Sequence, residues 1–370
     1  MESGREGRRS SRRNRERKRV KFNPTNNIRR QGCGKVIAGP DVNTCRGGVG
    51  ILVSEDVVKW LLEPENPSMK YRTLVELLGK SQNDHEAVEC KREIAESVPV
   101  KSLLSEMQPD GYWLQKNPRT GKMLGDGTEY GAFGTTHYCL SYLAELGMDR
   151  TNAQVARAAE RYLNLQKEDG DFRHHYSCLL GLNIRTFTML GYKNDSRVKR
   201  SIGLLLNTER PDGGYLCDMH EGKYKTKTVK SCMRGSVKAL LASSYLPDYW
   251  THDRIRKLIG YFLLRGGIFK STNLKELVNK DMERNSFPIS WRANVYEVLL
   301  ALSRMGYGKD SRLERAWSFL DVKADKNGRY ALDWTPEQSP WKVGKRNQPN
   351  KWITFYAHLA HKFRSEIRTW

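Results

Sequence analysis

The stretch from Glu209 to Ala242, ERPDGGYLCDMHEGKYKTKTVKSCMRGSVKALLA, decides the fold. An apolar helix is expected to end just before it. The run Asp212-Gly213-Gly214 then turns the chain, and Tyr215 follows. Glycine past a helix end supplies the left-handed residue that closes the last turn, and Asp accepts hydrogen bonds from the free amides of the turn. A second apolar helix begins near Lys230, so the unit is a helix, a turn, an aromatic residue and a helix.

The same order recurs along the chain, each time with Gly in the turn and an aromatic residue shortly after it. The other turns are Gln108-Pro109-Asp110-Gly111-Tyr112-Trp113, Gln166-Lys167-Glu168-Asp169-Gly170-Asp171-Phe172, Arg265-Gly266-Gly267-Ile268-Phe269 and Asp325-Lys326-Asn327-Gly328-Arg329-Tyr330. A fixed order at a loose period is typical of a repeat architecture. We expect each aromatic side chain to wedge between neighbouring units.

Apolar residues at helical spacing predict six pairs of helices. The pairs are 53–63 with 69–78, 98–107 with 135–146, 153–165 with 176–190, 197–206 with 229–243, 252–264 with 291–305, and 311–320 with 351–363. The first helix of each pair has a charged face and belongs outside, whereas the second is more continuously apolar and belongs inside. Six such hairpins can close into a ring. The sequence therefore predicts an all-α fold, an (α/α)6 toroid of six helical hairpins with a central cavity at one end.

The formal net charge of +22 is unevenly distributed over the 370 residues. Residues 1–30 hold twelve Arg or Lys against three Glu, and such a segment is expected to be disordered. It is either a solvated tail or a weak electrostatic contact for nucleic acid or an anionic surface. Residues 31–50, with Cys33, Cys45 and six glycines, resemble a linker. We therefore divide the chain into a basic tail and linker, 1–50, and a toroid domain, 51–370.

The composition favours a soluble protein of the cytoplasm. The hydrophobic fraction of 38% is sufficient for a substantial core. No apolar run reaches the 18 or more residues of a transmembrane segment, and the basic N-terminus does not lead into the hydrophobic stretch of a signal peptide. The seven cysteines do not form a short disulfide-type framework, which indicates reduced thiols.

Two sets of residues resemble known families. The turns at residues 108–113 and 166–172 are similar to the Gln-Trp (QW) repeats of squalene and hopene cyclases, and residues 135–143, TTHYCLSYL, are similar to an inner helix of protein prenyltransferase β-subunits. The resemblance covers about residues 53–363. It implies a toroid of the terpenoid cyclase and protein prenyltransferase superfamily, whose cavity accepts an isoprenoid or another apolar ligand.

The chemical signatures of those families are incomplete in this chain. Class II terpene cyclases carry an Asp-x-Asp-Asp acid that protonates an alkene, and this sequence does not contain that motif; the nearest run, residues 168–171, is already explained as a turn. Prenyltransferase β-subunits hold zinc with Asp, Cys and His, and Thr135 stands where the family pattern would place that histidine. The family's zinc site is therefore not carried over residue by residue.

A zinc site of another kind is predicted from Cys217-x-x-His220, with Asp218 beside it and Cys232 at the start of an inner helix. Thiolate, imidazole and carboxylate are the ligands that Zn²⁺ prefers, and three protein ligands with one open position make a catalytic site. His174, His175 and Cys178 are expected at the same end of the ring. The alternative is that the cysteines are small buried apolar residues and the histidines lie in a solvated loop.

Four residues are the candidates for catalysis. Asp126 and Glu129 lie in a flexible loop before an inner helix, where they could act as acid and base or simply cap the helix. Arg292, like Arg185 and Arg234, is expected within an inner helix, where its charge needs an anion such as a diphosphate or an ion pair with Glu297 or Asp333.

Tyr296, the fourth candidate, belongs to an aromatic cluster of the last two repeats that lines an apolar or cation-stabilising pocket or belongs to the core. The other members are Trp291, Trp334, Trp341, Trp352 and Tyr356. Two basic loops, 223–230 and 342–351, would give the cavity a positive rim if they converge. Such a rim would suit an anionic ligand, and the alternative is that these charges only promote solubility.

These observations leave three functions open. The first is a prenyltransferase-like or terpene-cyclase-like protein, with zinc as a candidate cofactor, that binds an apolar isoprenoid-type substrate in the central cavity. The second is a noncatalytic scaffold on the same fold that holds a lipid or a peptide. The third, a carbohydrate-active toroid, has less support because no Asp and Glu pair is anchored in helices.

Overall fold

A computed structural model describes residues 53–125, 132–172, 177–217 and 230–366 of the chain. The chain divides into two compact units, residues 1–47 and 48–370, and the described residues all belong to the second unit. The predicted disordered tail and linker lie outside the described residues, so their conformation and the boundary at residue 50 stay predictions.

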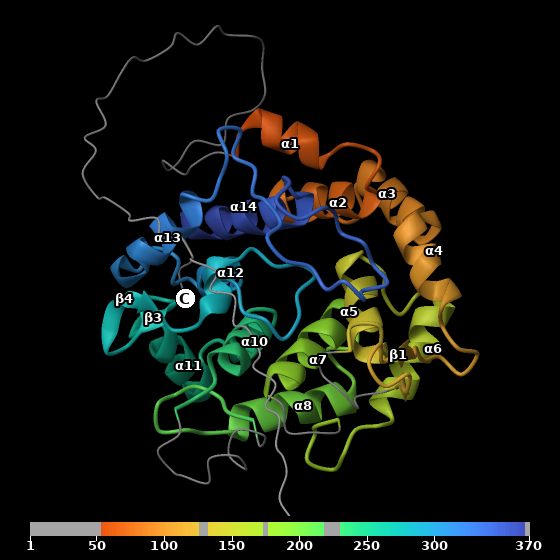
Figure 1. Ribbon diagram of the computed structural model, residues 1–370, viewed down its shortest axis with the longest axis horizontal. Coiled ribbons are helices and arrows are strands. Elements are labelled where there is room, and N and C mark those ends of the chain that lie inside the picture. Colours follow the sequence, from red (N-terminus) through yellow and green to blue (C-terminus); the bar gives the residue numbers. More distant parts are fainter. Residues whose placement is uncertain (1–52, 126–131, 173–176, 218–229, 367–370) are drawn as a thin grey trace, which may run out of the picture. The chain divides into compact units, whose positions relative to one another are not determined.

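In the part of the chain that the structure describes, six helices form an inner layer (Figure 1). They are α2 (Pro67–Arg72), continued by the π-helical turn η1 (Thr73–Leu77), α5 (Thr136–Glu145), α7 (Ser177–Met189), α10 (Met233–Ser243), α12 (Val295–Arg304) and α14 (Lys351–Ser365). Each of α5, α7, α10 and α12 packs against the next inner helix, and α14 packs against η1. An ion pair between Arg72 and Glu145 joins the first inner helix to α5 and closes the ring.

The second layer covers the inner one. It consists of α1 (Glu55–Leu61), α4 (Val98–Ser105), α6 (Ala153–Leu163), α8 (Ser196–Asn207), α11 (Asp253–Leu263) and α13 (Glu314–Asp321). Helix α6 packs on α5, α8 on α7, α11 on α10, and α13 on α12. The predicted (α/α)6 toroid is therefore confirmed.

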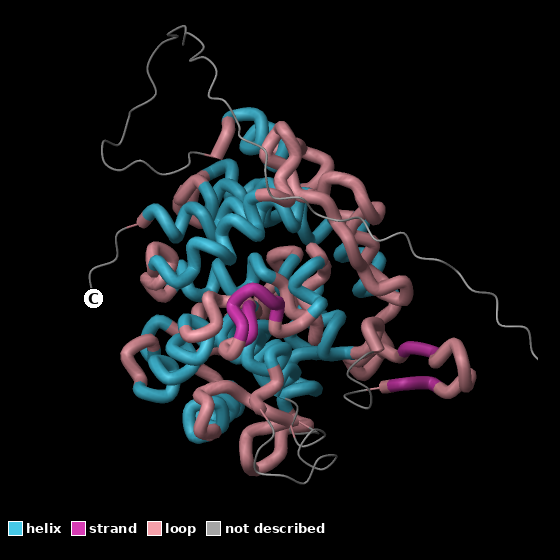
Figure 2. Tube along the Cα trace, turned by 60° about the vertical axis from the view of Figure 1, so that its left-hand side comes forward, coloured by secondary structure: helices cyan, strands magenta, loops and turns pink. Residues whose placement is uncertain are grey.

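The remaining described elements complete the fold. They are α3 (His85–Glu96), the 3-10 turns η2 (Pro247–Tyr249), η3 (Lys280–Glu283) and η4 (Ser311–Leu313), and the strands β1 (Gln115–Lys116), β2 (Met123–Leu124), β3 (Phe269–Lys270) and β4 (Asn273–Leu277). The strands form two antiparallel hairpins, β1–β2 and β3–β4, drawn in magenta in Figure 2. Within the described ranges, no helix is long and apolar enough to cross a membrane.

The predicted turns act as the repeated device of the ring. Gly111, Gly170, Gly213, Gly267 and Gly328 all have positive φ, as expected for residues that close a helix. A Cβ on Gly170 would lie 2.7 Å from the Arg200 carbonyl of α8, and one on Gly213 would lie 2.7 Å from the Lys257 carbonyl of α11. Each of these turns therefore packs directly on the next outer helix.

The aromatic residue after the turn fixes the angle between units. Trp113 Nε1 donates to the Leu103 carbonyl of α4 at 2.7 Å, and Tyr215 Oη donates to the Leu205 carbonyl of α8 at 2.6 Å. The Tyr215 backbone N–H also donates to Ser236 Oγ of inner helix α10 at 2.9 Å. The predicted wedge is thus anchored to an outer helix and an inner helix at once.

We predict that Gly181→Ala lowers the free energy of unfolding by about 1 to 3 kcal/mol, because the new methyl group would lie 2.5 Å from the backbone of Lys238 and would push α7 away from α10. Gly203→Ala on α8 is the matched control. Its methyl group meets nothing within 4 Å, so the better helix propensity should raise the free energy of unfolding by up to about 1 kcal/mol. Urea unfolding followed by circular dichroism measures both; equal effects would contradict the close contact of these inner helices.

Candidate functional site

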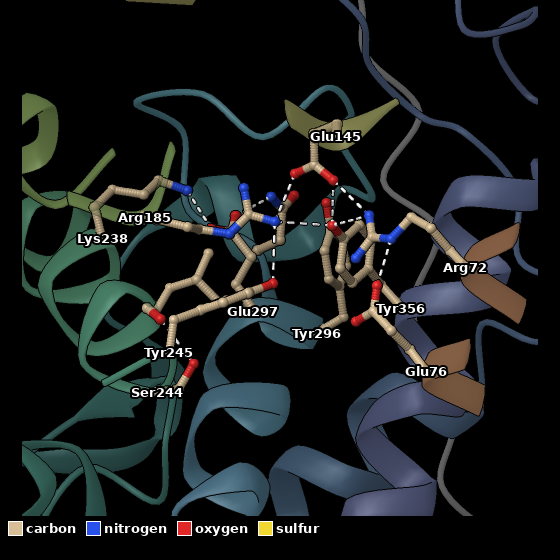
Figure 3. Close-up of polar contacts among 12 residues, drawn as sticks. Arg72, Glu76, Glu145, Arg185, Lys238, Ser244, Tyr245, Tyr296, Glu297 and Tyr356 are labelled. Atoms are coloured by element: carbon tan, nitrogen blue, oxygen red, sulfur yellow. Dashed lines mark hydrogen bonds and ion pairs between the residues drawn. The ribbon is translucent and has the colours of Figure 1, made fainter. Parts of the chain in front are cut away.

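A buried charged cluster fills the middle of the ring, and Glu145 is its centre (Figure 3). Arg72 Nη1 donates to Glu145 Oε2 at 2.6 Å, and Arg185 Nη2 lies 2.6 Å from Glu145 Oε1. The three side chains are at most 3% exposed. Because an unpaired buried charge is very costly, each of these residues depends on the others.

Tyr356 of α14 ties a fourth inner helix to this cluster. Its hydroxyl donates to Glu145 and accepts hydrogen bonds from Arg72 Nη1 at 2.8 Å and Arg185 Nη2 at 2.9 Å. Burial raises the pKa of Tyr356 well above its ordinary value, so the phenol stays protonated. At the edge of the cluster, Arg72 Nε donates to Glu76 at 2.6 Å.

A second buried pair lies beside the first. Lys238 of α10 and Glu297 of α12 form an ion pair with no exposed side-chain surface. Burial lowers the pKa of Lys238. Asn294 also donates to Glu297 and accepts a hydrogen bond from the Ser286 backbone N–H at 2.9 Å. The charged groups in the middle of the ring are thus paired with one another, although Arg72 Nη2, Arg185 Nε and Arg185 Nη1 have no hydrogen-bond partner within the described residues.

The end of the ring where α10 and α12 begin has a different character. Arg234, the second residue of α10, donates from Nε to Asp281 Oδ2 at 2.6 Å, and Arg292 donates from Nη1 to Asp281 Oδ1 at 3.0 Å. The arginine side chains are 33% and 21% exposed. Burial lowers the pKa of Arg292; Asp281 opposes this shift, and repulsion by Arg234 and Arg284 adds to it. The carboxylate of Asp281 therefore faces the positive charges of both Arg234 and Arg292.

Aromatic rings continue from these arginines across the same end. The Arg234 guanidinium lies 4.4 Å from the Trp291 ring centre, and the Arg292 guanidinium lies 4.2 Å from that of Trp334. The ring centres of Trp334 and Phe133 are 5.8 Å apart, and those of Phe133 and Tyr138 of α5 are 5.0 Å apart. Trp291, Trp334 and Phe133 are only partly buried. Positive charge and apolar ring surface are thus adjacent at this end of the ring. We call Arg234, Arg292, Trp291, Trp334 and Phe133 the arginine–aromatic site.

The structure corrects the placement of Arg292 and the predicted ion pairs. Arg292 precedes α12, which begins at Val295 after the N-cap Asn294, so the expectation that Arg292 lies within an inner helix is wrong. The predicted ion-pair partners of Arg185, Arg234 and Arg292 are Glu297 or Asp333. In the structure, Arg185 pairs with Glu145, and both Arg234 and Arg292 pair with Asp281. Only Arg185 lies deep in an inner helix.

The other predicted catalytic residues have separate outcomes. Tyr296 lies in the first turn of α12 and is fully buried; its hydroxyl donates to the Ser286 carbonyl at 2.7 Å, and its ring stacks on Tyr356. Burial raises the pKa of Tyr296 well above its ordinary value. The phenol of Tyr296 therefore stays protonated in the core. Asp126 and Glu129 lie outside the described residues.

The predicted metal ligands are described only in part. Cys217 is buried, Cys232 is the N-cap residue of α10, and Asp218 and His220 lie outside the described residues. Burial, with a further contribution from Cys232 and Cys217, raises the pKa of Cys178 to about 12. Among the side chains that the structure describes, no three His, Cys, Asp or Glu residues form a group that could hold a metal ion.

No protein-family model matches the chain, and no curated protein matches it. Several solved structures have a similar backbone fold. One is a family 88 glycosyl hydrolase from Bacteroides vulgatus, which is 14% identical in sequence. The match covers 84% of this chain and 97% of the hydrolase, with a TM-score of 0.49. A polysaccharide lyase has 14% identity, covers 84% and 96%, and has a TM-score of 0.48. A type II terpene cyclase from Scytonema has 15% identity, covers 74% and 76%, and has a TM-score of 0.43.

We predict that Glu145→Gln lowers the free energy of unfolding by about 3 to 5 kcal/mol, because it leaves the buried Arg72 and Arg185 without their shared counter-charge. Glu209→Gln is the control, since Glu209 pairs with Lys257 at an exposed surface, where loss of an ion pair costs about 1 kcal/mol or less. Equilibrium urea unfolding at constant salt measures both. A loss for Glu145→Gln as small as that of the control would show that the cluster does not hold the ring together.

Proposed function

We propose that this toroid binds an apolar, isoprenoid-type molecule with an anionic head, the head on Arg234 and Arg292 and the apolar chain on the neighbouring rings. The observation that carries the proposal is the shared carboxylate: Asp281 accepts from both arginines, and each guanidinium also lies against a tryptophan. A phosphate or diphosphate would supply the missing negative charge.

The chemistry of the arginines supports an anionic head. Guanidinium groups bind phosphate oxygens through paired, charge-assisted hydrogen bonds. Arg292 Nε is buried and, within the described part of the chain, has no hydrogen-bond partner, so this arginine retains a free donor. The net charge of +22 would also attract an anionic ligand over a distance.

The aromatic residues support an apolar chain. Trp334 and Phe133 are in edge contact, and Phe133 packs on Tyr138 at the start of α5. Trp334 and Phe133 are partly exposed, and they lead from Arg292, just before α12, to the buried Tyr138 of α5. A chain of isoprene units would bury apolar surface along this path, and each CH₂ group removed from water contributes about 0.8 kcal/mol.

The noncatalytic alternative is favoured by a specific observation. The phenols and carboxylates in the middle of the ring, Tyr296, Tyr356, Glu145 and Glu297, are already hydrogen bonded or ion-paired within the protein. These four residues support the structure. None of them is placed as a general acid beside Arg234 and Arg292. A prenyltransferase-like or cyclase-like reaction would therefore draw on groups near the arginine–aromatic site, whereas a lipid-binding scaffold needs only the site itself.

The test uses farnesyl diphosphate and farnesol as probes, with binding followed by tryptophan fluorescence. Arg234→Ala and Arg292→Ala should each weaken binding of farnesyl diphosphate about 10- to 100-fold, because a hydrogen bond to a charged group contributes about 1.5 to 3 kcal/mol. Binding of farnesol, which has no diphosphate, should be weaker in the wild type and unchanged by either substitution. Arg119→Ala, at an exposed position between β1 and β2, is the control. Equal losses for both probes, or no binding of the diphosphate, would overturn the proposal.

Zinc at Cys217, Asp218, His220 and Cys232 belongs to the enzymatic form of this proposal. The described residues supply only thiols to such a site, so no reaction step is derived through the metal. If Zn²⁺ bound to these residues, it would act as a Lewis acid near the start of α10.

Metal analysis of the purified protein by mass spectrometry is expected to find about one zinc per chain. Cys217→Ala and His220→Ala should each remove it, and Cys90→Ala, which changes a buried thiol on α3, should not. Absence of zinc from the wild type, or a zinc content that none of these substitutions changes, would exclude this site and leave the scaffold form.

A further inference from the structure

A groove of about 650 Å³ lies between the β3–β4 hairpin and α13, on the outer side of the ring. Figure 1 shows the hairpin beside α13. Phe269 of β3, Leu277 of β4, and Phe319 and Val322 at the end of α13 and just after it give the groove an apolar lining. Val322 is 80% exposed, which is a high value for a large apolar side chain next to other apolar groups.

The rim of the groove is basic. Its lining includes four basic side chains, Lys270, Lys275, Lys280 and Arg315, and two acidic ones, Glu276 and Glu283. Lys270 pairs with Glu276. Within the described residues, Lys275, Lys280 and Arg315 have no carboxylate within ion-pair distance.

Arg315 is held in place although it has no carboxylate partner. Its guanidinium lies 4.7 Å from the Phe269 ring centre, and Nη2 donates to the Lys275 carbonyl at 3.4 Å. Its charge is therefore fixed above the apolar floor. A ligand that combined negative charge with an apolar side chain would match both properties of the groove.

The charge of the chain decides between possible occupants. Residues 1–30 carry twelve Arg or Lys and three Glu, so the protein's own N-terminal segment has the same sign of charge as the rim. A second copy of this chain, at +22, would also be repelled. Like charges across an interface are unfavourable, so the occupant is an acidic molecule other than this chain.

We propose that the groove between β4 and α13 binds an acidic peptide segment of a partner protein, with an apolar side chain of that segment on Phe269, Phe319 and Val322. The volume is within the range of about 300 to 1,000 Å³ that is typical of ligand sites, so it accommodates a few side chains of an extended segment. Binding depends on Lys275 and Lys280 for its charge and weakens as salt screens them.

The test is fluorescence anisotropy of the full-length protein with a labelled peptide of alternating Glu and Leu. The double substitution Lys275→Glu with Lys280→Glu should weaken binding at least about 10-fold, because two positive charges that attract the peptide become negative charges that repel it. The matched control is Lys199→Glu with Lys326→Glu, which makes the same charge change at two exposed positions elsewhere and should change binding less than about 2-fold.

The apolar part of the proposal has its own test. Val322→Ser, at a highly exposed position where folding is unaffected, should weaken binding of the Glu-Leu peptide and leave the much weaker binding of a Glu-Ser peptide unchanged. Absence of binding of the Glu-Leu peptide overturns the proposal, as does an equal loss in both double variants, which would indicate nonspecific attraction. Equal affinity for the two peptides would also overturn it, because the apolar floor would then have no role.

Discussion

The ion pairs of Glu145 with Arg72 and Arg185 hold the inner layer together. Glu145 ends α5, Arg72 ends α2 and Arg185 lies in α7, so one carboxylate joins three helices that are far apart in sequence. Tyr356 adds α14 to the same cluster. Because buried charges are stable only when all partners are in place, this arrangement favours a closed ring over an open array of hairpins.

This cluster also divides the molecule into a structural part and a part available for binding. The groups in the middle of the ring use their charges and phenols on one another, as Lys238 does with Glu297. At the end where α10 and α12 begin, Arg234 and Arg292 also share one carboxylate, that of Asp281, but their side chains are partly exposed and lie against partly exposed aromatic rings. The proposed ligand site is therefore the arginine–aromatic site, and the centre of the ring contributes to stability.

The fold could be predicted from the sequence because its signals are local. The positive φ of Gly213 and the wedge of Tyr215 follow from the order of residues within one unit. Helix α3 was missed because its sequence is strongly charged, although Asp84, which caps it, was a usable signal. The start of α12 was placed too early because Asn294 was not recognised as its cap.

The partners of the charged residues could not be predicted in the same way. Arg185 meets Glu145 and Tyr356 only after the ring has closed, and Tyr356 lies 171 residues further along the chain. A helical pattern shows that Arg185 is inward-facing and does not show which carboxylate it meets. The predicted zinc site stays a prediction, because two of its ligands, Asp218 and His220, lie outside the described residues.

The most direct test of the assignment is a crystal structure of the protein with farnesyl diphosphate. The account predicts the diphosphate within hydrogen-bond distance of Arg234 and Arg292, the isoprenoid chain on Trp334 and Phe133, and the Arg72–Glu145–Arg185 cluster unchanged. A ligand that displaces Tyr356 from Glu145 and occupies the middle of the ring would contradict it.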